Sequence, residues 1–320
     1  MAAQTMVYHS GVVNQGILIS MRCRFFYLLF LFPVIANSAY PQSAGGPVQG
    51  NGNDEALTVV STIWPLHLLV SEIIGEDGTS LALIDLNDSA HHFTLTPDDR
   101  MAIARADLLV WIDPLFEVQL AQLVASTSDN RPVITATTLP AVTTRPYSNG
   151  VLDPHLWLDP GNAAAIAYAV ANALAQLAPD KAMGFNERAS ELAAELTDLR
   201  AQVAELGSTE SKPFFVYHDA FSYFETVAGI KHAATLVDDP DAEPSMRTLL
   251  NLRRQADDLQ PGCVMLEPEA SADLVASVFR DQTPRKVVVD VLAHGIPAGE
   301  GAYARFINHM LVSFEECLHG

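Results

Sequence analysis

The 320-residue sequence contains few basic residues and a low proportion of charged residues. Its 18 Lys and Arg stand against 38 Asp and Glu, which gives a formal net charge of −20. Such a surface repels the phosphate backbone of nucleic acids, so we expect no nucleic-acid partner. Charged residues make up 18% of the chain and hydrophobic residues 49%, a balance that builds a substantial core and argues against global disorder.

Motifs of several common enzyme classes are absent. No glycine-rich phosphate loop stands between a predicted strand and a helix, and there is no Gly-x-Ser-x-Gly or His-Glu-x-x-His sequence. A metallohydrolase stays open as the enzymatic alternative, with Glu267 as a base beside a zinc-bound water.

The start of the chain lacks a hydrophobic run long enough to span a bilayer comfortably. The apolar run at residues 25–35 is shorter than the roughly 20 residues of a membrane-spanning helix. Two arginines precede this run and a small-residue segment follows it at 36–39, which predicts a cleavable signal peptide over residues 1–39. An uncleaved anchor is the alternative. Residues 40–56, rich in Gly, Pro, Asn and Ser, are predicted to be a disordered leader.

Cysteine is also scarce, with three in the chain. Cys23 lies in the predicted signal peptide, so its removal leaves Cys263 and Cys317. Two cysteines in an exported chain most simply form one disulfide.

Beyond the leader, β-branched runs alternate with helical segments, which predicts βαβ units and parallel sheets. A long amphipathic helix over about residues 180–206 interrupts this alternation. We interpret it as a spine between two lobes; the alternative is a dimeric coiled coil, for which under four heptads are little support. Its apolar positions are Phe185, Ala189, Leu192, Leu196, Leu199, Val203 and Leu206.

The predicted fold class is therefore α/β: two lobes, each a small parallel sheet flanked by helices, joined by one long rigid helix. The predicted division is an N-terminal lobe at 57–178, a linking helix at 179–207 and a C-terminal lobe at 208–320.

Four side chains suited to metal binding follow the ends of predicted strands. In open parallel sheets, ligands bind beyond the carboxyl ends of strands, so we expect these side chains to lie near a site. Imidazole nitrogens with carboxylate oxygens suit four-coordinate Zn²⁺. The four residues are His91, His218, Glu267 and Asp290, which follow strands predicted at 81–86, 214–217, 263–266 and 286–289.

A fifth candidate, His155, lies in the middle of the chain within the stretch Asp-Pro-His-Leu-Trp-Leu-Asp-Pro. Pro154 and Pro160 prevent a helix from running through this stretch and favour extended backbone before them. His155 is therefore predicted to lie on a short, stiff loop, as a metal ligand on which ligands from either side converge.

With these motifs in place, the chain resembles the cluster A-I metal-binding proteins of ABC importers, in particular the ZnuA-like zinc group. The resemblance covers roughly residues 57–318. Its most specific motifs are HHFTLTPD at 91–98, ADLLVW at 106–111, DPHLWLDP at 153–160 and YHDAFSYFE at 217–225. It implies an exported, periplasmic, non-enzymatic protein that binds Zn²⁺ between two lobes and works with an ABC permease and its ATPase. It also implies a monomer, with a periplasmic metallochaperone as a further partner.

The resemblance further implies roles for individual residues. His91, His155 and His218 occupy the positions of the metal ligands, and Asp290 that of an acid which supplies a fourth ligand in some members. Water or a glutamate takes that place in others, so Glu267 or water is the alternative fourth ligand, and Glu267 is also a candidate for a supporting role beside the ligands. A third imidazole favours Zn²⁺, whereas manganese, the alternative metal, favours more oxygen ligands. Cys263 and Cys317 match the disulfide of the zinc branch.

The chain also departs from the family pattern. The long His- and acid-rich loop expected between Trp111 and Asp153 is absent or reduced, and Val291 replaces the usual proline after Asp290.

Overall fold

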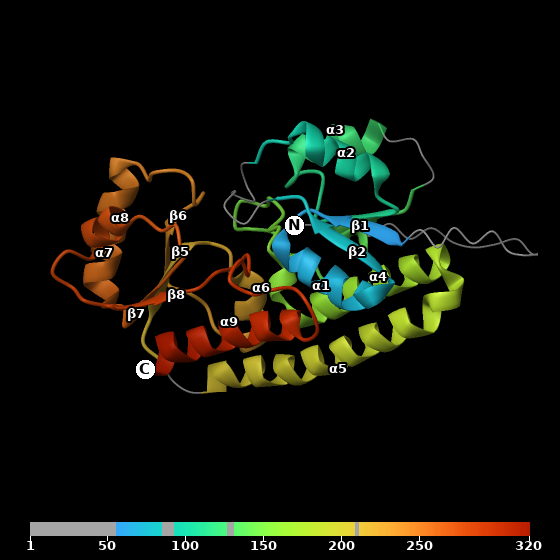
Figure 1. Ribbon diagram of the computed structural model, residues 1–320. Helices are drawn as coiled ribbons and strands as arrows, with labels where there is room; N and C mark the ends of the chain where they lie inside the picture. The colour runs from blue at the N-terminus through green and yellow to red at the C-terminus, as the bar shows by residue number, and fades with distance from the viewer. Residues whose placement is uncertain (1–55, 85–92, 127–130, 209–210) are drawn as a thin grey trace, which may run out of the picture. The chain divides into compact units, whose positions relative to one another are not determined.

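The computed structural model describes residues 56–84, 93–126, 131–208 and 211–320. Within these residues it contains two four-stranded parallel sheets (Figure 1). The first has the strand order β2-β1-β3-β4 and the second β6-β5-β7-β8, so the two halves of the chain repeat one topology. The strands are β1 (Leu57–Ser61), β2 (Gly78–Ala82), β3 (Leu108–Trp111), β4 (Val133–Thr135), β5 (Phe214–His218), β6 (Ala234–Val237), β7 (Cys263–Leu266) and β8 (Arg285–Val288).

This topology confirms the predicted α/β class and shows where a site is expected. The strand order reverses between β1 and β3 in one sheet and between β5 and β7 in the other. Ligands of open α/β sheets bind beyond the carboxyl ends of the strands at such a reversal. His218 ends β5 and Glu267 follows β7, so both lie at the reversal of the second sheet.

The long helix follows its predicted segment within a few residues, and capping side chains mark the starts of several other helices. Thr96, for example, accepts a hydrogen bond from the Asp99 amide, and the Asp99 carboxylate accepts one from the Thr96 amide. The helices are α1 (Trp64–Ile74), α2 (Pro97–Arg105), α3 (Val118–Ser126), α4 (Pro160–Leu177), α5 (Ala182–Glu205), α6 (Ser222–Ala228), α7 (Met246–Leu259), α8 (Ala272–Phe279) and α9 (Ala302–His319). No helix among them combines the length and apolar character needed to cross a membrane.

One strand differs from its predicted position. Residues 81–86 were expected as a strand, whereas β2 covers Gly78–Ala82 and pairs with Leu57–Ser61 of β1. The sequence pattern marks the apolar residues, but the pairing partner sets the register. The polar residues at the start of β2 therefore join the sheet through backbone hydrogen bonds, and their side chains do not indicate a strand.

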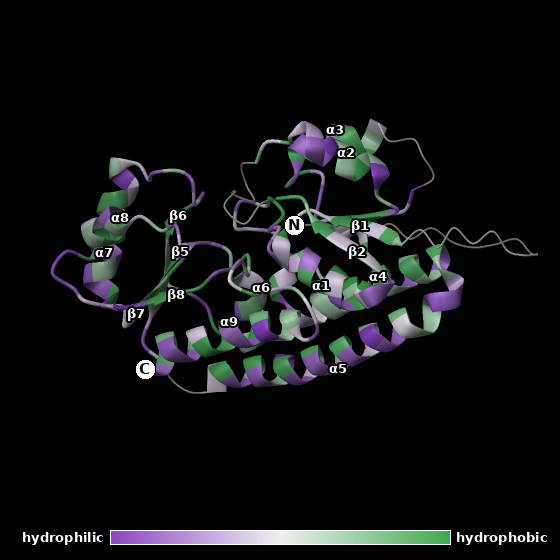
Figure 2. Ribbon diagram, viewed as in Figure 1, coloured by the Kyte–Doolittle hydropathy of each residue, from purple (hydrophilic) through white to green (hydrophobic). Residues whose placement is uncertain are grey.

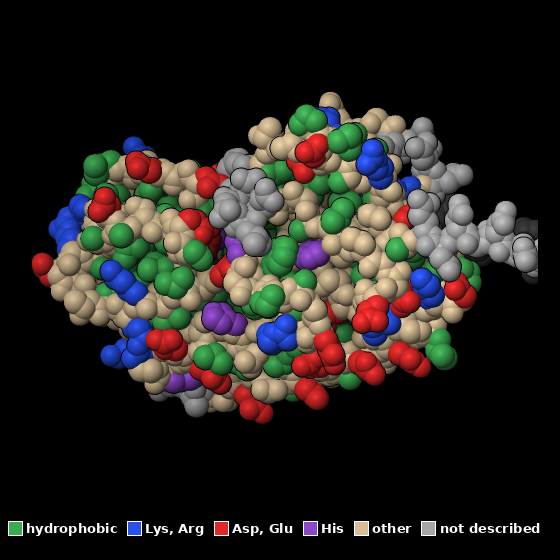
Figure 3. Space-filling view, viewed as in Figure 1, with side chains coloured by type: hydrophobic (Ala, Val, Ile, Leu, Met, Phe, Trp, Pro, Cys, Tyr) green, Lys and Arg blue, Asp and Glu red, His purple; other side chains and the backbone are tan. Residues whose placement is uncertain are grey.

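The long helix α5 is the predicted spine, and all seven predicted apolar positions are buried, six of them in α5 and the seventh, Leu206, directly after it. Its 24 residues extend about 36 Å, and it packs along α4 and also contacts α1, α6 and α9. The alternation of apolar and polar faces along α5 is visible in Figure 2. Acidic side chains gather along the edge that α5 forms in Figure 3, which agrees with the exposure of Glu187, Glu191 and Asp198.

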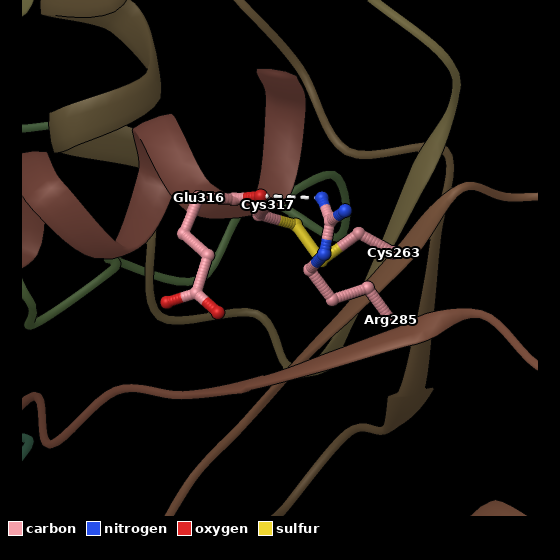
Figure 4. Close-up of a disulfide and its surroundings, with 4 residues drawn as sticks. All are labelled: Cys263, Arg285, Glu316 and Cys317. Atoms are coloured by element: carbon pink, nitrogen blue, oxygen red, sulfur yellow. Dashed lines mark hydrogen bonds between the residues drawn. A yellow bond between two sulfur atoms is a disulfide. The ribbon is translucent and has the colours of Figure 1, made fainter. Parts of the chain in front are cut away.

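A disulfide between Cys263 of β7 and Cys317 of α9 confirms the predicted pairing (Figure 4). The two Cα atoms are 5.4 Å apart. Beside it, Nη1 of Arg285 donates to the backbone oxygen of Glu316 at 2.7 Å. Together these bonds attach the end of the last helix to two neighbouring strands of the second sheet.

Contacts between the two halves come partly from the segment between β8 and α9. The indole nitrogen of Trp64 donates to the Ile296 oxygen, and that of Trp157 to the Val291 oxygen, both at 2.9 Å. The largest cluster of buried apolar side chains includes residues from both halves. Residues 54–320 accordingly form one compact unit.

Candidate metal centre

His155 lies on the loop that leads into α4, as its two flanking prolines predicted. It is 1% exposed and precedes a single 3-10 turn at Leu156–Leu158. One carboxylate oxygen of Asp153, Oδ1, accepts hydrogen bonds from the His155 backbone amide at 3.0 Å and from its Nδ1 at 2.8 Å. The hydroxyl of Tyr147 is 3.1 Å from the same Nδ1. The imidazole is therefore held on one side, and its Nε2 edge is left for other contacts.

His218 is held in a matching way from the second sheet. It is the last residue of β5 and is 2% exposed. Its Nδ1 hydrogen-bonds Oε1 of Glu267, a residue 3% exposed that follows β7, the strand beside β5. Because neighbouring parallel strands end at the same edge, their next side chains meet there. This contact gives Glu267 the supporting position that the sequence suggested.

The two imidazoles meet at their Nε2 atoms, which are 3.2 Å apart. In tetrahedral zinc sites the metal–nitrogen distance is about 2.0–2.1 Å, which places two ligand nitrogens ~3.3 Å from each other. A carboxylate bonded to Nδ1 keeps the proton on that nitrogen and leaves the Nε2 lone pair for a metal. The separation and the supporting carboxylates both fit a zinc-binding pair.

The electrostatics of the Asp153 side also suit this arrangement. Burial acts to raise the pKa of Asp153, but hydrogen bonds from His155 and Ser222 outweigh it, and the net shift is downward. Burial and the nearby Asp153 charge raise the pKa of Tyr147, so this hydroxyl keeps its proton. Asp153 is therefore an ionised acceptor for the Nδ1 proton of His155.

Asp290 has a different set of contacts. Its carboxylate accepts from the Leu292 amide at 2.9 Å and from the Gly295 amide at 3.4 Å, and it lies 4.0 Å from Nδ1 of His294. Across the described ranges, no three His, Cys, Asp or Glu side chains are close enough together to hold a metal. The structure thus brings His155 and His218 together but not Asp290 with them. His91, the remaining predicted ligand, lies outside the described residues.

Sequence reasoning did not assign roles to Asp153 and Tyr147. Asp153 lies two residues before His155, a spacing at which an Asp side chain often bonds the backbone amide two positions on. The sequence therefore contained a signal for the contact between Asp153 and His155. Tyr147 carried no such signal, since an isolated antiparallel bridge between Pro146 and Leu152 brings it near His155.

A two-sheet α/β fold with a buried, carboxylate-supported pair of imidazoles is typical of two-lobed metal-binding proteins. A sequence profile for the zinc-uptake complex component A, periplasmic (ZnuA), matches residues 59–317. The chain belongs to this family, which confirms the resemblance seen in its motifs.

Individual relatives are distant but align over most of their length. The high-affinity zinc uptake system protein ZnuA of Brucella abortus (strain 2308) is 25% identical over 304 residues, covering 81% of this chain and 91% of the relative. The protein of the same name from Paracoccus denitrificans is 26% identical over 303 residues, covering 82% and 92%.

Solved structures agree with the fold. A crystal structure of ZnuA superimposes with a TM-score of 0.70 at 21% identity, covering 82% of this chain and 98% of the other. The Zn(II)-bound ZnuA-like domain of Streptococcus pneumoniae AdcA gives a TM-score of 0.68 at 22% identity, covering 82% and 99%.

Proposed function

We propose that this chain captures Zn²⁺ outside the cytoplasmic membrane and delivers it to an ABC permease powered by an ATPase. The observation that carries the proposal is the meeting of His155 and His218, whose Nε2 atoms are 3.2 Å apart while each Nδ1 bonds a carboxylate. Family membership and the names of the relatives support it.

The proposed ligands are His91, His155 and His218, with Asp290 as the fourth. Glu267 and Asp153 would orient the imidazoles rather than bind the ion. Zn²⁺ is the cargo, and the proposal includes no covalent chemistry. Three imidazoles suit a borderline-soft ion such as Zn²⁺ better than Mn²⁺, which prefers more oxygen.

The same proposal includes the cellular location of the protein and the division of its chain. Residues 1–39 would be a cleaved signal peptide and 40–56 a leader, so that the mature chain is periplasmic. Residues 57–178 and 208–320 would be the two metal-binding lobes, with 179–207 as the linking helix. We propose a monomer that also accepts zinc from a periplasmic metallochaperone.

A competition titration with a chromophoric zinc chelator tests this function. Wild-type protein, H91A, H155A and H218A would be compared with H309A, because His309 is an exposed histidine on α9 that serves as a matched control. We expect one Zn²⁺ per wild-type or H309A chain, and affinity at least tenfold lower in each of the three other variants. Manganese is titrated in parallel and is expected to bind more weakly.

Two results would contradict the proposal. Wild-type protein that fails to bind zinc stoichiometrically would contradict the function itself. Unchanged zinc binding in all three ligand variants would contradict the site. Hydrolytic activity that depends on bound zinc would favour the metallohydrolase instead.

A further inference from the structure

The carboxylate of Asp153 uses its two oxygens on the two halves of the protein. Oδ1 accepts from the amide and the Nδ1 of His155, in the first half. Oδ2 accepts from the hydroxyl of Ser222, the first residue of α6 in the second half. Ser222 comes four residues after His218, so one buried carboxylate links the surroundings of both imidazoles.

The backbone of Asp153 also forms a hydrogen bond to α6. Its carbonyl oxygen accepts from the hydroxyl of Tyr223, the second residue of α6, at 2.9 Å. The same hydroxyl accepts from the Arg145 amide, also at 2.9 Å. Burial raises the pKa of Tyr223 to about 12, so this hydroxyl stays protonated and able to donate. Two consecutive residues of α6 thus bond to Asp153, one to its side chain and one to its backbone.

The hydrogen bond from Ser222 is important because the Asp153 carboxylate is buried. Asp153 is 0% exposed, and no Lys or Arg of the described residues forms a salt bridge with it. A buried carboxylate is tolerated only when its oxygens are supplied with donors. Ser222 donates to Oδ2, so a change there removes the hydrogen bond by which α6 holds this carboxylate.

We propose that Asp153 is a positioning residue that sets the separation of the two imidazoles before metal binds, through Ser222. One oxygen fixes the ring of His155, and the other fixes the start of the helix that directly follows the His218 loop. The inference rests on the proposed zinc-binding function. It extends that function by naming one contact, between Asp153 and Ser222, that holds His155 and His218 in place before the metal binds. Preformed ligand geometry lowers the cost of ordering the site when the ion arrives.

The test uses three single variants of the full chain. S222A removes the hydroxyl that reaches Asp153, and S222T restores a hydroxyl at the same position. T226A is the matched control, because Thr226 is an exposed residue of α6 whose hydroxyl bonds the backbone oxygen of Ser222 and not Asp153. Zinc affinity is measured by chelator competition, and ring nitrogen resonances of the histidines are recorded in the metal-free protein.

We expect S222A to bind zinc about tenfold more weakly, in the range found for residues that orient metal ligands, and S222T to recover most of this loss. T226A is expected to bind like wild type. In metal-free S222A, the ring signals of His155 and His218 should shift. His232 provides an internal control, since its Nδ1 bonds Glu225 of α6 at 2.8 Å. Its signals should stay in place.

Three outcomes would overturn the proposal. The first is S222A binding zinc within twofold of wild type with unchanged His155 and His218 signals. The second is a shift of the His232 signals together with those of His155, which would mean that Ser222 only stabilises α6. The third is a failure of S222T to recover any affinity. A wild-type protein that binds no zinc would contradict the proposed function, while the metal-free spectra would still report on Asp153.

Discussion

Glu72 of α1 accepts the backbone N–H of Tyr303 at 2.6 Å with Oε1, although 231 residues separate the two in the sequence. Its Oε2 accepts the N–H of Gly301 at 3.0 Å. A carboxylate from the first half of the chain thus caps the start of α9, the last helix. Burial raises the pKa of Glu72 to about 7, even though both backbone hydrogen bonds act to lower it.

Because the pKa of Glu72 is raised, we expect this residue to make the free energy of unfolding depend on pH. The folded state holds the proton up to about pH 7, whereas the unfolded chain releases it near pH 4.5. Between these values the folded state binds more protons, so the free energy of unfolding falls as pH rises. Because the side chain is partly exposed, we expect a contribution on the order of 2 kcal/mol across this window.

Urea denaturation of wild type and E72Q at pH 5, 6, 7 and 8 measures this contribution. The difference between the two proteins isolates Glu72, because other groups contribute equally to both. Glu117, whose pKa burial also raises to about 7, is one of these. We expect the Gln variant to lose less stability between pH 5 and pH 7 than wild type. Parallel pH profiles for the two proteins would contradict the assignment.

Arg188 should contribute more to stability than Arg200, the other arginine of α5. Its guanidinium donates to the carbonyl oxygens of Ile73 and Ile74 at the end of α1, and it pairs with Asp77 at 2.8 Å. We expect R188A to lower the free energy of unfolding by about 2 kcal/mol, because the end of α1 loses its donors. The control is R200A, since the Arg200 side chain is 52% exposed and 3.4 Å from Asp159. A loss in R188A no larger than in R200A would refute the prediction.

The disulfide should stabilise the fold by restricting the unfolded chain. Cys263 and Cys317 are 54 residues apart, and a loop of this size typically corresponds to about 2–4 kcal/mol. We expect the double variant C263A/C317A to unfold at correspondingly lower urea concentration. Adding a reductant should lower the midpoint of the wild type and leave that of the variant unchanged. Equal midpoints for the oxidised wild type and the variant would rule out this contribution.

Glu267 should control zinc affinity through His218. E267Q keeps the shape of the side chain but weakens its hold on the Nδ1 proton, so we expect zinc affinity to fall by about tenfold or more. E315Q is the matched control, because Glu315 is an exposed carboxylate on α9. Zinc affinity is measured by chelator competition on both variants. An affinity for E267Q equal to that of E315Q would show that the His218–Glu267 contact does not serve binding.

Local patterns in the sequence predicted much of the fold. The spacing of Phe185, Leu192 and Leu199, for example, marks a helix with one apolar face. These signals act within a few residues, so they are readable before folding. The same reading placed His155 on a stiff loop and His218 at the end of a strand, and the structure confirms both positions.

Contacts between distant segments were not predictable in this way. The bonds of Asp153 to Ser222 and of Glu72 to Tyr303 depend on how the two halves pack, and no local pattern encodes that packing. Asp290 shows how a local pattern and a local contact can coincide. Its position after β8 predicts a metal ligand, and the turn that follows gives its carboxylate two nearby amide donors. An Asp side chain commonly accepts hydrogen bonds from amides a few residues further on, and its role as a fourth ligand stays a prediction.

The location of α9 has a consequence for the order in which the protein can be completed. Phe314 of α9 packs against Phe214, Phe221 and Phe224, and Cys317 bonds Cys263. These partners are made well before α9 during synthesis. Until α9 is made, these aromatic side chains lack their contacts with Phe314, and Glu72 has no helix to cap. The complete core therefore forms only once α9 is present, and a chain interrupted before residue 302 would expose an aromatic surface prone to aggregation.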